Sequence, residues 1–218
     1  MVAHLQREID NLKKKILQLG AHVEESLSKA VRSFQDRDAE MAKSVIENDQ
    51  IIDAFEVEIE EDCLKILALY QPVAIDLRFL VAVLKINNDL ERIGDLSVNI
   101  AERAQNLAAK KRLPIPAELE KMQEHARAML GKSLDALVNL DAGLAKQVCA
   151  MDDDLDQMNR NMYEMIKQEL DRSKENSHHF IHLLTVSRQL ERIGDQATNI
   201  AEDVVYMIEG TIIRHKEI

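Results

Sequence analysis

The sequence predicts an all-α protein in which six long helices form two tandem, pseudo-symmetric three-helix bundles. Its composition favours helices, because only 6 Gly and 3 Pro occur among 218 residues and the commonest residues are good helix formers. A fourteen-residue phrase also occurs twice, at 89–102 and at 189–202, with ten identical positions. A phrase repeated at this distance indicates a duplicated unit.

Interruptions in the helical spacing divide the chain into six segments. They fall near residues 36–38, 71–72, 113–116, 140–143 and 172–174. Pro72 and Pro116 suit the first turn of a new helix, where the missing N–H costs nothing. We therefore expect residues 1–112 to form the first three-helix bundle and residues 116–218 to form the second.

Apolar residues within the second and third segments recur at helical steps, which predicts the buried face of each helix. The expected core positions are Val45, Ile52, Phe55, Ile59, Cys63 and Ile66 in the second segment, and Leu77, Leu80, Val81, Leu84, Ile93 and Ile100 in the third.

Composition also limits the class of partner and the compartment. A net charge of −11 and 3% aromatic residues argue against binding to nucleic acid, which attracts Lys, Arg and stacking rings. We find no apolar run that resembles a signal peptide or a membrane span. Cys63 and Cys149 form no C-x-x-C pair and are expected to be reduced thiols. These features predict a cytoplasmic protein.

Carboxylates spaced four apart are the most informative chemical pattern, because this spacing places both on one face of a helix. Each copy of the repeated phrase carries one such pair, and a second pair lies about forty residues upstream of each copy. The candidate metal ligands are Asp49, Asp53, Glu91 and Asp95 in the first half, and Asp152, Asp156, Glu191 and Asp195 in the second. Possible additional ligands are Asn99, Glu102, Asn199 and Glu202.

Two interpretations of these carboxylates remain open from spacing alone. Four carboxylates gathered from adjacent helices repel one another unless a cation neutralises them, and hard cations such as Mg²⁺, Mn²⁺, Ca²⁺ or iron prefer oxygen ligands. Charged residues also cover the exposed face of most helices. Gly94 and Gly194 lie inside the repeated phrase, and a mid-helix glycine indicates close approach of a packed helix or of a ligand cluster.

The chain resembles the PhoU family of phosphate-signalling regulators over essentially its whole length. Three features carry the resemblance: Gln71-Pro72-Val73-Ala74-Ile75-Asp76-Leu77-Arg78, the two Glu-Arg-Ile-Gly-Asp phrases with their Asn-Ile-Ala-Glu tails, and the upstream Asp-x-x-x-Asp pairs. The segment from Pro72 to Arg78 has no counterpart in the second half, so the two halves are not expected to do equal work.

The resemblance implies a cytoplasmic adaptor without catalytic activity that damps phosphate uptake and the response to phosphate starvation. It implies contacts with the ATPase of a phosphate ABC transporter and with a sensor histidine kinase, so that any membrane association is indirect. It also implies metal ions, iron or zinc, at the paired carboxylates named above. A homodimer is expected as well.

Two other classes of protein are alternatives to the adaptor. A ferritin-like di-metal protein needs two Glu-x-x-His motifs, and only Glu175-Asn176-Ser177-His178 fits this pattern. A purely structural helical interaction module predicts no metal uptake. The sequence contains no phosphate-binding glycine loop or nucleophile elbow, so we predict that the protein is not an enzyme.

Overall fold

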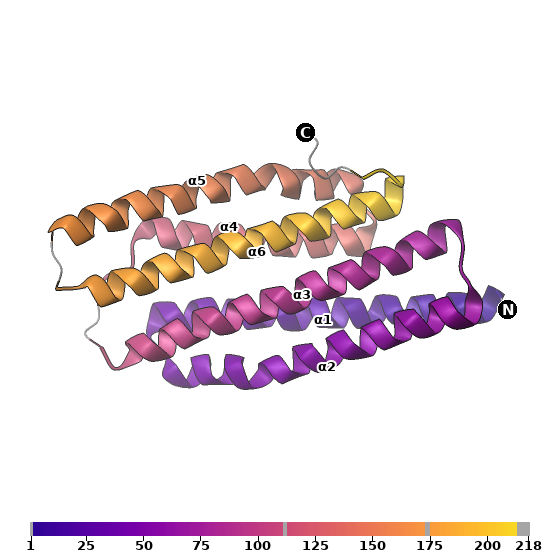
Figure 1. The fold of residues 1–218 in the computed structure, drawn as a ribbon, viewed down its shortest axis with the longest axis horizontal. Coiled ribbons are helices and arrows are strands. Elements are labelled where there is room, and N and C mark those ends of the chain that lie inside the picture. Colours follow the sequence, from indigo (N-terminus) through magenta and orange to yellow (C-terminus); the bar gives the residue numbers. More distant parts are fainter. Residues whose placement is uncertain (1, 111–112, 173–174, 213–218) are drawn as a thin grey trace.

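The computed structural model describes residues 2–110, 113–172 and 175–212, and it confirms the predicted six helices (Figure 1). The helices are α1 (Val2–Asp36), α2 (Ala39–Tyr70), α3 (Ala74–Ala108), α4 (Ala117–Asn139), α5 (Ala142–Arg172) and α6 (Ser177–Glu209). Of the predicted breaks, Ser173 and Lys174 lie outside the described residues. Residues 111–112 and 213–218, at the ends of the two predicted units, also lie outside them.

The turns from α1 to α2 and from α4 to α5 have the same construction, as a duplication predicts. The residue before each turn aspartate, Arg37 or Leu140, has a left-handed backbone with φ of 59° or 53°. Asp38 then accepts a hydrogen bond from the Met41 N–H at 2.9 Å. Asp141 accepts one from the Leu144 N–H, also at 2.9 Å. Each aspartate satisfies one of the backbone N–H groups that a helix start leaves unpaired.

The link between α2 and α3 differs from the prediction made for Pro72. Gln71 caps α2 in the left-handed conformation, and Pro72 follows it as a buried residue of the link rather than in the first turn of α3. A proline directly after a left-handed helix cap is common because it cannot continue the helix. Pro116 lies at the N-cap of α4, one residue before the helix begins.

The two bundles pack against each other through α3 and α6. Contacts join α1, α2 and α3 in one half and α4, α5 and α6 in the other, and α3 packs along α6, with a smaller contact of α1 with α4. Figure 1 shows that α3 and α6 run in opposite directions along this interface. Apolar side chains from all six helices form one continuous core. The two predicted units therefore share a core rather than each enclosing its own.

Most of the predicted core positions are buried or half-buried. Leu77 is the exception, because 40% of its surface is exposed. It lies in the first turn of α3, the helix that begins beside the α2–α3 link (Figure 1). None of the helices in the described ranges is long and apolar enough to cross a membrane.

Candidate metal centre

The structure places the four carboxylates predicted for the first half on two adjacent helices. Asp49 and Asp53 lie on α2, and Glu91 and Asp95 lie on α3, which packs beside it. Each pair spans one helical turn, so all four side chains share the seam between the two helices. We call these four residues the first cluster.

Asp49 is the most constrained member of the first cluster. Its Oδ1 atom is buried and has no hydrogen-bond partner. Burial, together with the charges of Asp53 and Asp95, raises its pKa to about 6. Gly94 makes room for this oxygen, because a Cβ atom at residue 94 would lie 3.1 Å from Asp49 Oδ1.

A further carboxylate, Glu56, extends the first cluster along α2. Burial raises the pKa of Glu91, and the charges of Asp95, Asp53, Glu56 and Asp49 raise it further. Burial also raises the pKa of Glu56, with smaller contributions from Glu60 and Asp53. The Asn87 side-chain amide donates to the Glu56 backbone oxygen at 2.8 Å and to its carboxylate at 3.5 Å.

The second cluster gathers the four carboxylates predicted for the second half. Asp152 and Asp156 lie on α5, and Glu191 and Asp195 lie on α6. Burial, with the charges of Glu191, Asp152 and Asp156, raises the pKa of Asp195 to about 6, although Arg192 opposes the shift. Burial and Asp156 also raise the pKa of Glu191, which Arg188 and Arg192 lower.

Asp152 differs from its counterpart Asp49 because it has a partner. The Thr198 hydroxyl donates to Asp152 Oδ1 at 3.2 Å, and residue 98 of the first half, which aligns with Thr198, is valine. Burial raises the pKa of Asp152, while the hydrogen bond from Thr198 lowers it. Gly194 is packed against hydrocarbon, since a Cβ there would lie 2.4 Å from Leu155 Cδ2 and 3.5 Å from Met129.

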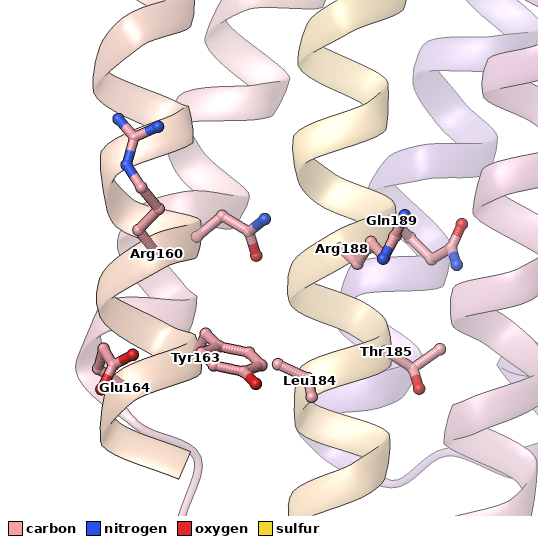
Figure 2. Close-up of a pocket in the computed structure, with 8 residues that line it drawn as sticks. Arg160, Tyr163, Glu164, Leu184, Thr185, Arg188 and Gln189 are labelled. Atoms are coloured by element: carbon pink, nitrogen blue, oxygen red, sulfur yellow. The ribbon is translucent and has the colours of Figure 1, made fainter. Parts of the chain in front are cut away.

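A groove of about 610 Å³ adjoins the second cluster, between α5 and α6. Figure 2 shows Tyr163 extending from α5 toward Leu184 on α6, with Arg160 and Arg188 contributed by α5 and α6 respectively. Arg160 pairs with Asp156 of the second cluster at 3.5 Å. Two arginines therefore lie beside this cluster.

The four possible additional ligands lie on α3 and α6, the helices that also carry the Glu-Arg-Ile-Gly-Asp phrases. The Asn99 amide donates to the Asp95 backbone oxygen at 2.9 Å, and Glu102 pairs with Arg103 at 3.1 Å. The charge of Glu202 adds to the effect of burial in raising the pKa of Cys149 to about 11. Asn199 is half-buried on α6.

The single Glu-x-x-His match in the sequence spans the start of α6. Glu175 lies in the turn before α6, whereas His178 lies within the helix. His178 faces His182 with 3.4 Å between their Nε2 atoms. His179 Nδ1 lies 3.2 Å from the Arg37 guanidinium, and because arginine only donates, this nitrogen accepts.

Neither cluster is closed around an ion in the recorded side-chain conformations. Among residues 2–110, 113–172 and 175–212, no three His, Cys, Asp or Glu side chains lie close enough together to enclose one. Asp53 and Asp95 are exposed, whereas Asp49 is half-buried. The recorded arrangement is a set of oxygen ligands along a helix seam.

Comparison with known proteins places this chain in a family. A family model described as PhoU domain matches residues 16–104 and, separately, residues 119–204. The chain is 33% identical over 212 residues to the phosphate-specific transport system accessory protein PhoU of Escherichia coli, covering 95% of this chain and 86% of that protein. It is 36% identical over 214 residues to a PhoU homolog of Aquifex aeolicus, covering 98% of this chain and 97% of that protein.

Solved structures agree with the sequence comparisons. The crystal structure of PhoU from Pseudomonas aeruginosa superposes with a TM-score of 0.92 at 33% identity, covering 94% of this chain and 99% of that one. The phosphate transport system regulatory protein PhoU from Streptococcus pneumoniae superposes with a TM-score of 0.88 at 30% identity, covering 95% and 98%.

Proposed function

The chain belongs to the PhoU family, and from that premise we propose that it is a cation-binding accessory protein that negatively regulates phosphate uptake and the phosphate-starvation response. The family consists of accessory and regulatory proteins rather than enzymes, so the prediction of a non-enzymatic protein is confirmed. The finer claims, which concern the cation, the partners and the compartment, are proposals.

The observation that carries the cation proposal is the unpaired, buried Asp49 Oδ1 atom. A buried carboxylate oxygen without a donor is costly, and the negative charges of Asp53 and Asp95 add to that cost. A cation bound on this seam removes that cost and the repulsion together. Gly94 leaves the space that the oxygen occupies. These two features support a cation at this seam, reached by a change of side-chain rotamers.

The proposed ligands are Asp49, Asp53, Glu91 and Asp95 in the first half, and Asp152, Asp156, Glu191 and Asp195 in the second. Ligands made only of carboxylate oxygen suit Mg²⁺, Mn²⁺, Ca²⁺ and iron better than they suit zinc, which favours nitrogen and sulfur. Each cluster draws on two helices, so a bound ion would link α2 to α3 or α5 to α6 and stiffen the seam. We propose this linking role rather than catalysis.

We propose as partners the ATPase of a phosphate ABC transporter and a sensor histidine kinase, with the protein acting in the cytoplasm as a homodimer. The names of the E. coli and S. pneumoniae relatives, which refer to phosphate transport, support a partner in that system. Exposed apolar side chains at the α2–α3 link, among them Leu69, Val73 and Ile75, support protein contacts, because such residues often mark interaction surfaces.

Two experiments test the partner proposals. Purified protein is immobilised, and binding of the transporter ATPase and of the kinase cytoplasmic domain is measured by interferometry in Mn²⁺ and in a chelator. Saturable binding of either partner supports the proposal, and binding of neither overturns it. Deletion of the gene should raise phosphate uptake in phosphate-rich medium, and unchanged uptake would contradict negative regulation. Light scattering measures the oligomeric state.

A further inference from the structure

We propose that the start of α6 binds a small inorganic oxyanion, of the phosphate or sulfate class, between Arg103 on α3 and the imidazoles of His178 and His182. Figure 1 shows the last turn of α3 and the first turn of α6 at the same end of the molecule. The site is separate from both carboxylate clusters, and it does not depend on the proposed cation binding. Three features of this end support it: the chemistry of the helix start, buried basic groups that need an acceptor, and positive charge.

The first feature is the start of α6. In the described part of the chain, the side chain of the preceding residue, Asn176, makes no capping hydrogen bond. The first backbone bonds of the helix run from the N–H groups of His179 and Phe180 to the Asn176 oxygen, at 3.0 and 3.2 Å. The first turn of α6 holds no acidic residue, whereas those of α2, α3 and α4 each hold at least one. The partial positive charge of this helix start is therefore not met by a carboxylate of its own, and such a start favours an anion.

The second feature is a pair of buried nitrogen atoms, Arg103 Nε and His182 Nδ1, which have no hydrogen-bond partner among the described residues. His182 is only 7% exposed. Its ring packs edge to face on that of His178, with centroids 4.5 Å apart, so it points back toward the helix start. Arginine stays protonated and only donates, so Arg103 Nε is a buried donor that needs an acceptor. The Nη2 atom of Arg103 already donates to Glu102 at 3.1 Å.

The imidazoles of His178 and His182 supply a further donor. Their Nε2 atoms lie 3.4 Å apart, so only one of the two carries a proton directed at the other. When His178 donates this proton, neutral His182 carries its own proton on Nδ1, which then becomes a second buried donor without an acceptor. An oxyanion that accepts from His182 Nδ1 and from Arg103 Nε removes the cost of both unpaired groups.

The third feature is positive charge. Burial lowers the pKa of His182, and the charges of His178, Arg103, His179 and Arg37 lower it further. These basic side chains come from α6, α3 and the α1–α2 turn, so they converge on His182 from three elements. A metal cation is repelled in these surroundings, and a water molecule satisfies hydrogen bonds without neutralising charge. An anion does both, and it favours protonation of the imidazoles beside it.

NMR titration of the full-length protein with sodium phosphate and with sodium sulfate, followed through the imidazole nitrogens, tests the site. At about pH 6.5, near the ordinary pKa of histidine, and at constant ionic strength, the signals of His178 and His182 should shift saturably with one dissociation constant. The signals of His22 and His125, which lie elsewhere in the fold, should not. Absence of a saturable shift overturns the proposal, and so do equal shifts in sodium chloride.

The pH dependence of sulfate binding tests the role of the imidazoles, because sulfate keeps its charge while phosphate titrates. Since the pKa of His182 is lowered in the folded protein, its ring is neutral before binding and takes up a proton when the anion binds. The dissociation constant should therefore fall between about pH 8 and pH 6, by up to about tenfold per pH unit for each proton taken up. A constant that does not change with pH overturns the imidazoles as ligands.

Substitutions locate the site. Arg103→Gln removes a charge and the Nε donor and should weaken sulfate binding about tenfold or more. His178→Asn, at an exposed position, should also weaken binding. Arg127→Gln removes the same charge from an exposed position of α4 and should leave the dissociation constant unchanged. Circular dichroism checks that each variant retains its helices.

Two results with these variants overturn the assignment of the site. One is undiminished sulfate binding in Arg103→Gln and His178→Asn, and the other is an equal loss in Arg127→Gln. Neither result bears on the proposed cation sites, which are tested with metal ions alone.

Discussion

The two Glu-Arg-Ile-Gly-Asp phrases have the same sequence but different surroundings. Gly94 faces Ile52 and the unpaired carboxylate oxygen of Asp49, which would lie 3.1 Å from a Cβ atom built at residue 94. Gly194 faces Leu155 and Met129, while Asp152 turns to Thr198. The phrase therefore specifies a helix and a close approach, and the helix packed beside it determines whether a carboxylate or hydrocarbon uses the space.

The largest expected effect is a loss of stability, and it tests the core that the two halves share. Ile93 and Ile193 occupy equivalent positions and are both fully buried in the continuous core. Replacement of either by alanine should lower the free energy of unfolding by about 2–5 kcal/mol. Urea unfolding followed by circular dichroism should show a single transition in each variant. Two separate transitions would contradict a shared core.

A smaller effect should distinguish the two glycines. Gly194→Ala should destabilise the protein by about 1–2 kcal/mol, because overpacking against Leu155 exceeds the gain in helix propensity. Gly94→Ala meets its nearest neighbours at 3.1–3.2 Å and should be close to neutral in the chelator-treated protein. Thermal unfolding measures both. Equal losses would show that the two glycines serve the same packing role.

The hydroxyl of Thr198 should contribute less to the stability of the fold than the packing around Gly194 does. Thr198→Val removes the donor to Asp152 and should cost about 1 kcal/mol. Val98→Thr offers Asp49 Oδ1 a donor and should stabilise the fold by a similar or smaller amount. Urea unfolding of both variants at pH 7 without divalent cations is the measurement. A stabilised Thr198→Val would contradict the assigned hydrogen bond.

The smallest effect concerns pH. Asp49 and Asp195 each have a folded-state pKa of about 6, raised from 3.8, so the folded state holds their protons more tightly. The protonated carboxyl groups stabilise the folded state fully below about pH 4, and this stabilisation is lost as pH rises through 6. Asp49→Asn and Asp195→Asn should therefore gain stability relative to wild type across this window, with a modest amplitude because both sites are partly hydrated.

Unfolding midpoints of the two variants and wild type, measured from pH 4 to 8 in a chelator, test this prediction. The difference should grow up to about pH 7 and then level off. A difference that does not change with pH would contradict the raised pKa values.

The sequence predicted the helices and the residues of the two carboxylate clusters. It did not predict how the surroundings of the two clusters differ. Helical spacing and the repeat located all six helices, because long amphipathic segments leave a periodic pattern. The four-residue spacing located Asp49 and Asp152, since helix geometry alone fixes which residues share a face. The partners of those residues depend on how α2 lies against α3, which no local pattern encodes. Val98 and Thr198 could be aligned in the sequence, but their consequence required the structure.

The electrostatic partners of Glu56 and Arg188 could not be predicted from the sequence either. Both are ordinary charged residues of exposed or half-exposed helix faces in the sequence, where such residues are abundant. Their relation to Glu91 and Glu191 depends on the approach of a second helix. The packing of α3 on α6 could not be predicted for the same reason, because apolar residues on different faces of one helix follow the same period.

The opposed packing of α3 and α6 has a consequence for how this molecule can change over generations. Two identical chains joined face to face about a twofold axis would present every substitution twice, once in each copy. Here the two faces belong to one polypeptide, so a mutation alters one side alone. Glu56 can arise without a second glutamate at residue 159, and Arg188 without an arginine at residue 88. Fusion into one chain releases the pair from symmetry and allows its two halves to specialise.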